Sequence, residues 1–313
     1  MISGEMSDFR HAYEQALASD HPLLQDVATH LLAHSGKQLR PMLTILSGKL
    51  CGDVNEKTIG SAVAFELMHT ASLVHDDVVD HSPLRRGVDS VQHRWTNKVA
   101  VLTGDYLLAK VIEVTAALRN LKIFNIVAEI GKTLAQGELI QLHAGESMWI
   151  TEETYYRMIE KKTAMLFAAC TQAGAVSAGA GGRVEGAMRT FGKELGLVFQ
   201  MKDDVLDYSE SGETGKPTMS DIRDGKATLP LLISLERAPK AEADSLKQLV
   251  ESGSSEVEQS VLSFVLRYDG IRYVQQQMEA HKRKAIEALS VFPDSSIKAA
   301  LIQLLEYTIS RVN

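Results

Sequence analysis

The distribution of proline constrains the fold of this chain more than any other feature of its sequence. The seven prolines leave residues 84–216 without a single one, and this interval is rich in Ala, Leu, Glu, Lys and Met. Because proline removes a backbone N–H and clashes with the preceding helical turn, such a tract of strong helix formers favours several long helices. No convincing run of strict apolar–polar alternation indicates a strand. We therefore predict an all-α fold.

Apolar periodicity locates the expected helices. The segment 58–80 carries too many apolar side chains for a surface helix, Phe65 and Leu67 among them, so we expect it to be central. The polar, glycine-bearing stretch 209–217 is expected to form a loop. Because no low-complexity linker divides the chain, we expect a single domain over residues 1–313. The other expected helices span residues 93–119, 123–143, 151–179, 184–208 and 228–237.

Composition excludes several classes of protein. The 33 basic and 40 acidic residues give a formal net charge of −7, and 45% of the residues are hydrophobic. This balance argues against general nucleic-acid binding and against global disorder. Two cysteines, Cys51 and Cys170, are too few for a disulfide scaffold or a cysteine zinc site, and they suit a reducing cytoplasm. We expect neither a signal peptide nor a transmembrane segment, because the uncharged stretch 163–182 contains glycines and polar residues that favour a helix buried in protein.

An acidic motif with carboxylates at positions i, i+1 and i+4 occurs twice. Its members are Asp76, Asp77 and Asp80 in the first copy and Asp203, Asp204 and Asp207 in the second. On a helix, residues i and i+4 share a face and residue i+1 lies about 100° round it, so the carboxylates crowd together. Such charges repel unless a cation lies between them, and hard oxygen ligands suit Mg²⁺. One copy alone could be a solvated acidic helix end. Because both copies follow apolar stretches, we predict that all six aspartates are metal ligands.

Basic residues accompany both acidic motifs. They are Lys37, Arg40, Arg85, Arg86, Lys162, Lys216 and Lys226. Taken singly, each would be interpreted as a member of a surface ion pair. Together, in an acidic protein, they favour diphosphate binding, because arginine binds phosphate oxygens directly while Mg²⁺ links others to carboxylates.

These motifs, in this order, resemble the polyprenyl synthetase family, the trans-isoprenyl diphosphate synthases. The matching stretches are 36–41, 66–80, 85–87, 104–105, 137–138, 162–163, 191–208 and 225–230. Gln38 departs from the basic or small residue that many members have there. After Arg237 the resemblance is one of helical character and carries little functional information. The resemblance implies a large helical bundle of the isoprenoid synthase type around a central deep cavity, and a homodimer.

The resemblance also implies a reaction and a role for each residue. An allylic diphosphate binds between the aspartate motifs through about three Mg²⁺ ions. The residues implied to bind its oxygens are Arg85, Lys162, Lys216 and Lys226. Those implied to bind isopentenyl diphosphate are Lys37, Arg40, His69 and Arg86. Diphosphate departure leaves an allylic carbocation, the isopentenyl double bond attacks it, and a proton is lost. Thr163 and Gln200 are implied to direct oxygen dipoles at the carbocation, and stabilisation of charge on the leaving group is expected to dominate catalysis.

Small residues before the first motif bear on product length. Ala71 and Ser72 lie about one helical turn before Asp76, and Met68 lies a further turn back. A growing chain whose diphosphate is fixed at the aspartates must pass these positions, where bulky aromatics would act as a floor, as the resemblance suggests for short-chain members. We therefore expect a product longer than four isoprene units, for quinone or related isoprenoid biosynthesis. The alternative is a purely structural role, in which the small residues only permit close helix packing.

Parts of the sequence also fit other functions. Glu66 and His69 form an ExxH pair, but a di-iron carboxylate bundle needs a second such pair and two more glutamates, and the sequence offers no second pair. Terpene cyclases that resemble this family usually carry an Asn/Ser/Glu-type second motif, whereas the second motif here is rich in aspartate. A short-chain farnesyl or geranylgeranyl diphosphate synthase stays open as an alternative. So does a non-catalytic subunit of a heteromeric synthase, although such subunits usually lack motif residues that this chain retains.

Overall fold

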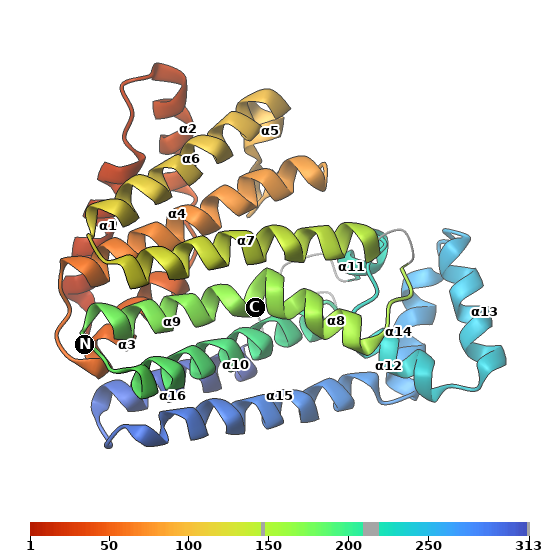
Figure 1. Ribbon diagram of the computed structural model, residues 1–313. Coiled ribbons are helices and arrows are strands. Elements are labelled where there is room, and N and C mark those ends of the chain that lie inside the picture. The colour runs from red at the N-terminus through yellow and green to blue at the C-terminus, as the bar shows by residue number, and fades with distance from the viewer. Residues whose placement is uncertain (145–147, 209–218, 312–313) are drawn as a thin grey trace. The chain divides into compact units, whose positions relative to one another are not determined.

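The computed structural model describes residues 1–144, 148–208 and 219–311, and nearly all of their regular structure is α-helix (Figure 1). The predicted all-α class is thereby confirmed. Contacts divide the chain into two compact units, which are described separately. Unit 1 comprises Met1–Lys132, Leu166–Gly192 and Ser295–Lys298, and unit 2 comprises Thr133–Met165, Lys193–Asp294 and Ala299–Asn313. The expectation of one domain over residues 1–313 stays a prediction.

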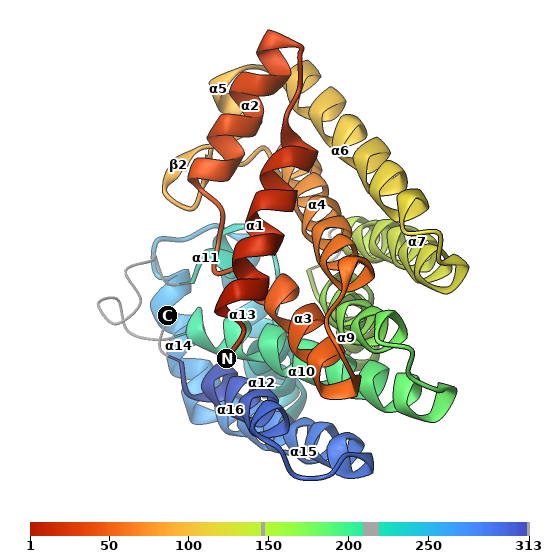
Figure 2. The same cartoon turned by 90° about the vertical axis from the view of Figure 1, so that its left-hand side faces the viewer.

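Unit 1 is built around a central helix. Its elements are α1 (Ser3–Leu17), α2 (Pro22–Ala33), α3 (Leu39–Cys51), α4 (Glu56–Val79), α5 (Val91–Arg94), α6 (Asn97–Ala117), the first part of α7 (Leu121–Ala144), most of α9 (Met165–Ser177) and the first part of α10 (Gly182–Leu206). Helix α4 packs against α1, α3, α5 and α6 (Figure 2). Every residue from Ser61 to Met68 is buried, so α4 has no solvent-facing side there and is central, as predicted.

Short polar side chains set the ends of two helices in unit 1. Asn55 and Thr58 form a capping box that begins α4. The segment 93–119, expected as one helix, is interrupted between α5 and α6, and Thr96 Oγ1 accepts a hydrogen bond from the Val99 amide to begin α6. Apolar periodicity does not register such caps, and the interruption was therefore missed.

A two-stranded hairpin follows the first aspartate motif. Strand β1 (Leu84–Arg85) pairs antiparallel with β2 (Val88–Asp89). The two residues between them, Arg86 and Gly87, have φ values of 54° and 79°. Two successive positive φ angles are typical of the tight turns that match strand twist, and the glycine adopts its angle without strain. The hairpin was not predicted, because two-residue strands are too short to show alternation.

Unit 2 contains the later helices. Its elements are α8 (Glu152–Ile159), a π-helical turn (Glu160–Ala164), α11 (Ser220–Arg223), α12 (Leu229–Arg237), α13 (Lys240–Glu251), α14 (Val257–Arg267), α15 (Gly270–Ala288), a 3₁₀ turn (Leu289–Val291), the later parts of α7 and α10, and most of α16 (Ser296–Ser310). Helix α12 packs against α14 and α15. A Cβ atom at Gly270 would lie 2.1 Å from the Pro230 carbonyl oxygen, so glycine is what lets α15 begin in contact with α12.

The uncharged stretch 163–182 is accounted for by α9. Almost every residue of this helix is buried among other helices, which confirms the predicted buried helix. Within the described ranges, no helix combines the length and the apolarity that crossing a bilayer requires.

Candidate active site

The first aspartate motif ends helix α4 in unit 1. Asp76 is half-buried, and Asp80 is exposed and follows the last helical residue, Val79. Residues i and i+4 share a helix face, so these two carboxylates belong to the same side of α4. The C-terminal end of a helix carries partial negative charge, which disfavours carboxylates unless a cation is near. This turn is therefore suited to bind a cation.

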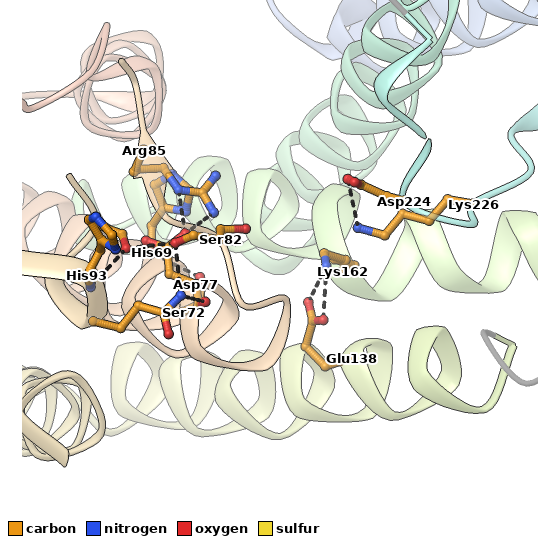
Figure 3. A network of polar contacts seen from close by, with 12 residues as sticks. His69, Ser72, Asp77, Ser82, Arg85, His93, Glu138, Lys162, Asp224 and Lys226 are labelled. Atoms are coloured by element: carbon orange, nitrogen blue, oxygen red, sulfur yellow. Dashed lines mark hydrogen bonds and ion pairs between the residues drawn. The ribbon is translucent and has the colours of Figure 1, made fainter. Parts of the chain in front are cut away.

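Asp77, in contrast, is buried and bound within the protein. Arg85 donates two hydrogen bonds to Asp77 Oδ1, one from Nε over 2.8 Å and one from Nη2 (Figure 3). Gln92 donates to the carbonyl oxygen of Asp77 over 2.6 Å. Burial raises the pKa of Asp77, and the hydrogen bond from Arg85 acts against that rise. Asp77 thus holds the hairpin arginine in place, and its predicted role as a metal ligand stays a prediction.

A small cavity lies beside this motif, wholly within unit 1. Its volume is about 50 Å³, and its lining includes Glu66, His69, Asp77, Arg85 and Arg86. Burial, and after it the charges of Arg40, Arg86 and Arg85, lower the pKa of His69 well below its ordinary value. A neutral imidazole beside several guanidinium groups can form a hydrogen bond without adding to the positive charge. The cavity is therefore suited to an anion with several oxygens.

Glycine brings one hairpin arginine to the loop before α3. A Cβ atom at Gly36 would lie 2.6 Å from Arg86 Nη2, and Arg86 Nη1 donates to the His34 carbonyl over 2.7 Å. The Arg40 guanidinium lies over an aromatic ring of α9, 5.1 Å from its centre. Lys37 is exposed on the same loop. Of the four residues assigned to isopentenyl diphosphate, His69 and Arg86 thus line the cavity, the charge of Arg40 reaches it, and Lys37 lies on the adjoining loop.

Unit 2 contains a larger cavity, with a volume of about 220 Å³. Its lining includes Lys162, Thr163, Gln200, Asp204, Asp221 and Lys226. Five of these six residues were predicted site residues; Asp221 was not. Burial, and then the charge of Asp207, raise the pKa of Asp221 to about 7. Lys226 lies 3.9 Å from Asp224 (Figure 3), and its positive charge acts against the rise at Asp221. Lys216, the remaining predicted cation of this region, lies outside the described residues.

A chain of hydrogen bonds connects four side chains at this cavity. Thr163 Oγ1 donates to Gln200 Oε1 over 2.8 Å, and Gln200 Nε2 donates to Asp204 Oδ1 over 2.9 Å. Tyr155 donates from its hydroxyl to the other oxygen, Asp204 Oδ2. Burial raises the pKa of Asp204 to about 8, and both donors act against that rise. Asp204 therefore orients the Gln200 amide, which in turn orients the Thr163 hydroxyl.

Lys162 and Thr163, which line this cavity, lie in the π-helical turn. A Cβ atom at Gly137 would lie 2.8 Å from the Lys162 backbone nitrogen, and one at Gly196 would lie 2.5 Å from Ala164 Cα. Glycines of α7 and α10 thus let both helices approach the π-helical turn closely. Such turns are frequent at functional sites. Lys162 Nζ donates to Glu138 over 2.9 Å (Figure 3) and to Gln141 over 3.0 Å.

The outer aspartates of the second motif have different partners. Asp207 Oδ1 accepts hydrogen bonds from the Ser220 amide and hydroxyl, and Oδ2 accepts one from the Asp221 amide. Asp207 thus caps the start of α11. Asp203 Oδ1 accepts a hydrogen bond from Arg311 Nη2 over 2.6 Å, although 42% of the Asp203 side chain is exposed.

The donor atoms of these motifs fit Mg²⁺. Among the described residues no three Asp, Glu, His or Cys side chains converge as a ready-made metal cluster. Mg²⁺ does not require one, because it is commonly bound by one or two carboxylates and completed by water and substrate phosphates. Asp76, Asp80 and Asp203 have partly or fully exposed carboxylates that can serve in this way.

The residues assigned to product length lie on the buried side of α4. Ala71 is fully buried and Met68 is nearly so, while Ser72 is half-buried and donates from its hydroxyl to the His69 carbonyl. The Met68 methyl group lies 3.8 Å from the position of a Cβ atom on Gly131 of α7. The predicted role of these three residues in chain length stays a prediction.

Sequence reasoning missed three residues at these sites. Tyr155 and Asp221 share the unit 2 cavity with the predicted residues, and Arg311 contacts the second motif. A tyrosine seven residues before Lys162 carries no signal by itself, and neither does an aspartate soon after the segment 209–217, whose predicted loop lies outside the described residues. Arg311 lies in the C-terminal part that matched only in helical character. These contacts depend on how the helices pack.

Comparison with known proteins gives one consistent result. The Polyprenyl synthetase family model matches residues 21–265. Octaprenyl diphosphate synthase of Haemophilus influenzae is 35% identical over 94% of this chain and 90% of its own length. A short chain isoprenyl diphosphate synthase of Methanothermobacter thermautotrophicus is 34% identical over 98% of this chain and 96% of its own. The crystal structure of a polyprenyl synthase from Caulobacter crescentus, complexed with calcium and isoprenyl diphosphate, superposes with a TM-score of 0.93 at 34% identity, covering 100% of this chain and 96% of that one.

Proposed function

The chain belongs to the polyprenyl synthetase family and is a trans-prenyl diphosphate synthase, and we propose that it condenses isopentenyl diphosphate with an allylic diphosphate in a Mg²⁺-dependent reaction until the product exceeds four isoprene units. The observation that carries this proposal is the unit 2 cavity, where Lys162, Thr163, Gln200, Asp204 and Lys226 meet. It combines cations for a diphosphate with oriented oxygen dipoles. This combination suits ionisation of an allylic ester.

The unit 1 cavity is assigned to isopentenyl diphosphate. Arg40 and Arg86 bind its oxygens, His69 contributes an uncharged hydrogen bond, and Lys37 approaches from the adjoining loop. The low pKa of His69 supports this role, because a neutral ring lets the arginines crowd around the ligand without further repulsion.

The allylic diphosphate is assigned to the aspartate motifs and to Arg85, Lys162, Lys216 and Lys226. Asp76, Asp80 and Asp203 would hold the divalent ions, which supply charge neutralisation for the leaving diphosphate. Asp77, Asp204 and Asp207 are bound by protein donors. We expect them to hold the site's other groups in place, with metal coordination as their secondary role.

The chain's own groups act on each step of the condensation. Lys162 and Lys226 bind oxygens of the diphosphate as the allylic C–O bond breaks and its electron pair leaves with the diphosphate. Thr163 stays neutral. Its hydroxyl donates to Gln200, which directs the hydroxyl oxygen at the allylic cation. The isopentenyl π electrons form the new C–C bond, and the proton lost from the adjacent carbon leaves to a diphosphate oxygen.

Exposed apolar residues support the proposed homodimer. On α6 they are Val101, Leu102, Leu108 and Ile112, and at the start of α7 Leu121 and Phe124. Leu102 is 65% exposed and Ile112 60% exposed, in a helix whose other face is buried. Large apolar side chains exposed in this number on one helix are costly in water and suit a two-fold mate. Light scattering that finds a monomer at micromolar concentration would contradict the dimer.

Sizing of the product tests the proposed function. Wild-type enzyme is incubated with isopentenyl diphosphate, an allylic primer and Mg²⁺, and the prenyl chains are separated by length; we expect chains of more than four units. Ala71→Phe places an aromatic ring on the buried side of α4 and is expected to stop elongation at three or four units while the first condensation is largely kept. A wild type that releases mainly farnesyl or geranylgeranyl diphosphate would make the chain a short-chain synthase, as its Methanothermobacter relative is named.

A further inference from the structure

Arg311, the residue directly after helix α16, reaches the second aspartate motif within unit 2. Its Nη2 donates to Asp203 Oδ1 over 2.6 Å and to the Phe199 carbonyl oxygen over 3.2 Å. Its guanidinium carbon lies 4.3 Å from the centre of the Phe199 ring. Three contacts thus fix one guanidinium against α10. Its position is set by the docking of the C-terminal helix.

This contact differs from a surface ion pair in its burial. The Arg311 side chain is only 11% exposed, and its Nε is buried without a hydrogen-bond partner, whereas the Asp203 side chain is 42% exposed. A buried guanidinium is costly in free energy unless a carboxylate compensates its charge. The burial of Arg311 therefore favours keeping the ion pair formed. The Asp203 carboxylate is therefore bound through one oxygen by a rigid donor while the group stays accessible.

We infer that Arg311 is a positioning residue of the active site, which fixes the Asp203 carboxylate in the orientation that binds a divalent ion. The inference rests on the proposed function, since it takes Asp203 as a metal ligand. Donors that bind the second oxygen of a ligating carboxylate orient it and are worth about ten- to a hundredfold in metal affinity. The C-terminal residues, which carry no recognisable motif, are by this inference part of the catalytic machinery.

Two other roles for Arg311 make different predictions. If the guanidinium only occupied the place of a cation, its removal would strengthen divalent binding, because a repelling positive charge would be gone. If it only secured α16 on the fold, its removal would lower thermal stability and reduce all functions alike. The sign of the change in metal affinity separates the first role from positioning, and loss of the effect in the Asp203→Asn background separates the second.

The test measures Mn²⁺ binding directly. Wild type, Arg311→Gln, Asp203→Asn and the double variant are titrated with Mn²⁺ at fixed inorganic diphosphate, and the unbound ion is followed by electron paramagnetic resonance against a protein-free titration. We expect Arg311→Gln to raise the apparent Kd for Mn²⁺ about tenfold. We also expect no further effect of Arg311→Gln in the Asp203→Asn background, because residues that act through one contact are not additive.

Two further variants control for charge and for folding. Arg267 pairs with Glu242 over 3.0 Å and lies over the Tyr268 ring, so Arg267→Gln removes a similar set of contacts from an exposed arginine of the same unit. We expect its Mn²⁺ affinity to match wild type. Arg311→Lys keeps the charge and one donor but loses the planar guanidinium that lies over the Phe199 ring, and it should recover part of the affinity. Circular dichroism confirms that each variant is folded.

Unchanged or tighter Mn²⁺ binding in folded Arg311→Gln would overturn the inference, and so would an undiminished effect of Arg311→Gln in the Asp203→Asn background. If Arg311→Gln does not fold, Arg311→Lys decides instead: affinity equal to wild type refutes positioning by the guanidinium. These outcomes differ from failure of the proposed function, in which the wild type itself makes no prenyl product from isopentenyl diphosphate and any allylic primer.

Discussion

The two aspartate motifs share one sequence pattern but differ in what surrounds them. In both, the middle aspartate is buried. Asp77 in unit 1 accepts hydrogen bonds from the positively charged Arg85, whereas Asp204 in unit 2 accepts them from the neutral donors Tyr155 and Gln200. Burial raises the pKa of both carboxyls, and that of Asp204 to about 8.

The last aspartates of the two motifs differ as well. Asp80 is exposed at the end of α4, while Asp207 uses both oxygens to cap α11. The first motif is thus a helix end that secures one arginine. The second is the centre of a network that holds α11, the polar chain at the cavity and the C-terminal arginine. An identical spacing of carboxylates therefore does not imply identical roles.

We expect the largest loss of activity at the first aspartate of each motif, which is accessible in both. Asp76→Ala and Asp203→Ala should each lower kcat by about a thousandfold or more, because each removes an accessible carboxylate from a divalent ion. Chelation should abolish wild-type activity, and added Mg²⁺ should restore it. Circular dichroism should show an unchanged helix content. Full activity in either variant would remove that motif from the metal site.

Tyr155→Phe tests how much the hydrogen-bond network of the second motif contributes to catalysis. The variant leaves Asp204 with one donor fewer, so Gln200 and Thr163 lose their fixed orientation, and we expect kcat to fall about tenfold with little change in either KM. Tyr273→Phe is the matched control, because Tyr273 also donates to a carboxylate, Glu152, over 2.7 Å. Equal turnover in the two variants would contradict a role for the network in catalysis.

Variants at the two cavities should affect the KM values of the two substrates differently. Arg40→Ala should raise the KM for isopentenyl diphosphate several-fold more than the KM for the allylic diphosphate, and Lys37→Ala should do the same to a lesser degree. Lys226→Ala should show the reverse preference, because it removes a cation of the unit 2 cavity. Initial rates with one substrate varied and the other saturating provide the measurement. Parallel changes in both KM values would refute the division.

The smallest effect concerns stability and its dependence on pH. Because the pKa of Asp204 is raised in the folded protein from 3.8 to about 8, the wild type loses stability as pH rises through this interval, since only the unfolded chain ionises readily. In a chelator, Asp204→Asn should therefore raise Tm by a few °C more at about pH 8 than at about pH 5. Asp77→Asn should show a smaller difference, because Arg85 offsets the rise there. Calorimetry that finds the same pH dependence for both variants would remove this contrast between the motifs.

Much of the fold and of the residue content of the candidate site could be predicted from the sequence. Long helices follow from apolar spacing and the absence of proline, and α4 is central because its apolar residues leave no polar face. The reactive residue types follow from the paired motifs and their basic neighbours. The break at Thr96 and the hairpin at Arg86 could not be predicted in this way, because they depend on single side-chain caps and on two backbone angles.

The sequence by itself determined the helical class and the family, and it predicted the carboxylates and cations of the candidate site, because these depend on local spacing and residue chemistry. Only the tertiary structure decided which charges are buried and what they meet. Asp77 contacts Arg85, and Asp204 contacts Tyr155. Asp207 caps helix α11, and Asp203 contacts Arg311, the last described residue of the chain. Burial and partner set the pKa and orientation of a carboxylate, and both arise from residues far apart in the sequence that packing brings together.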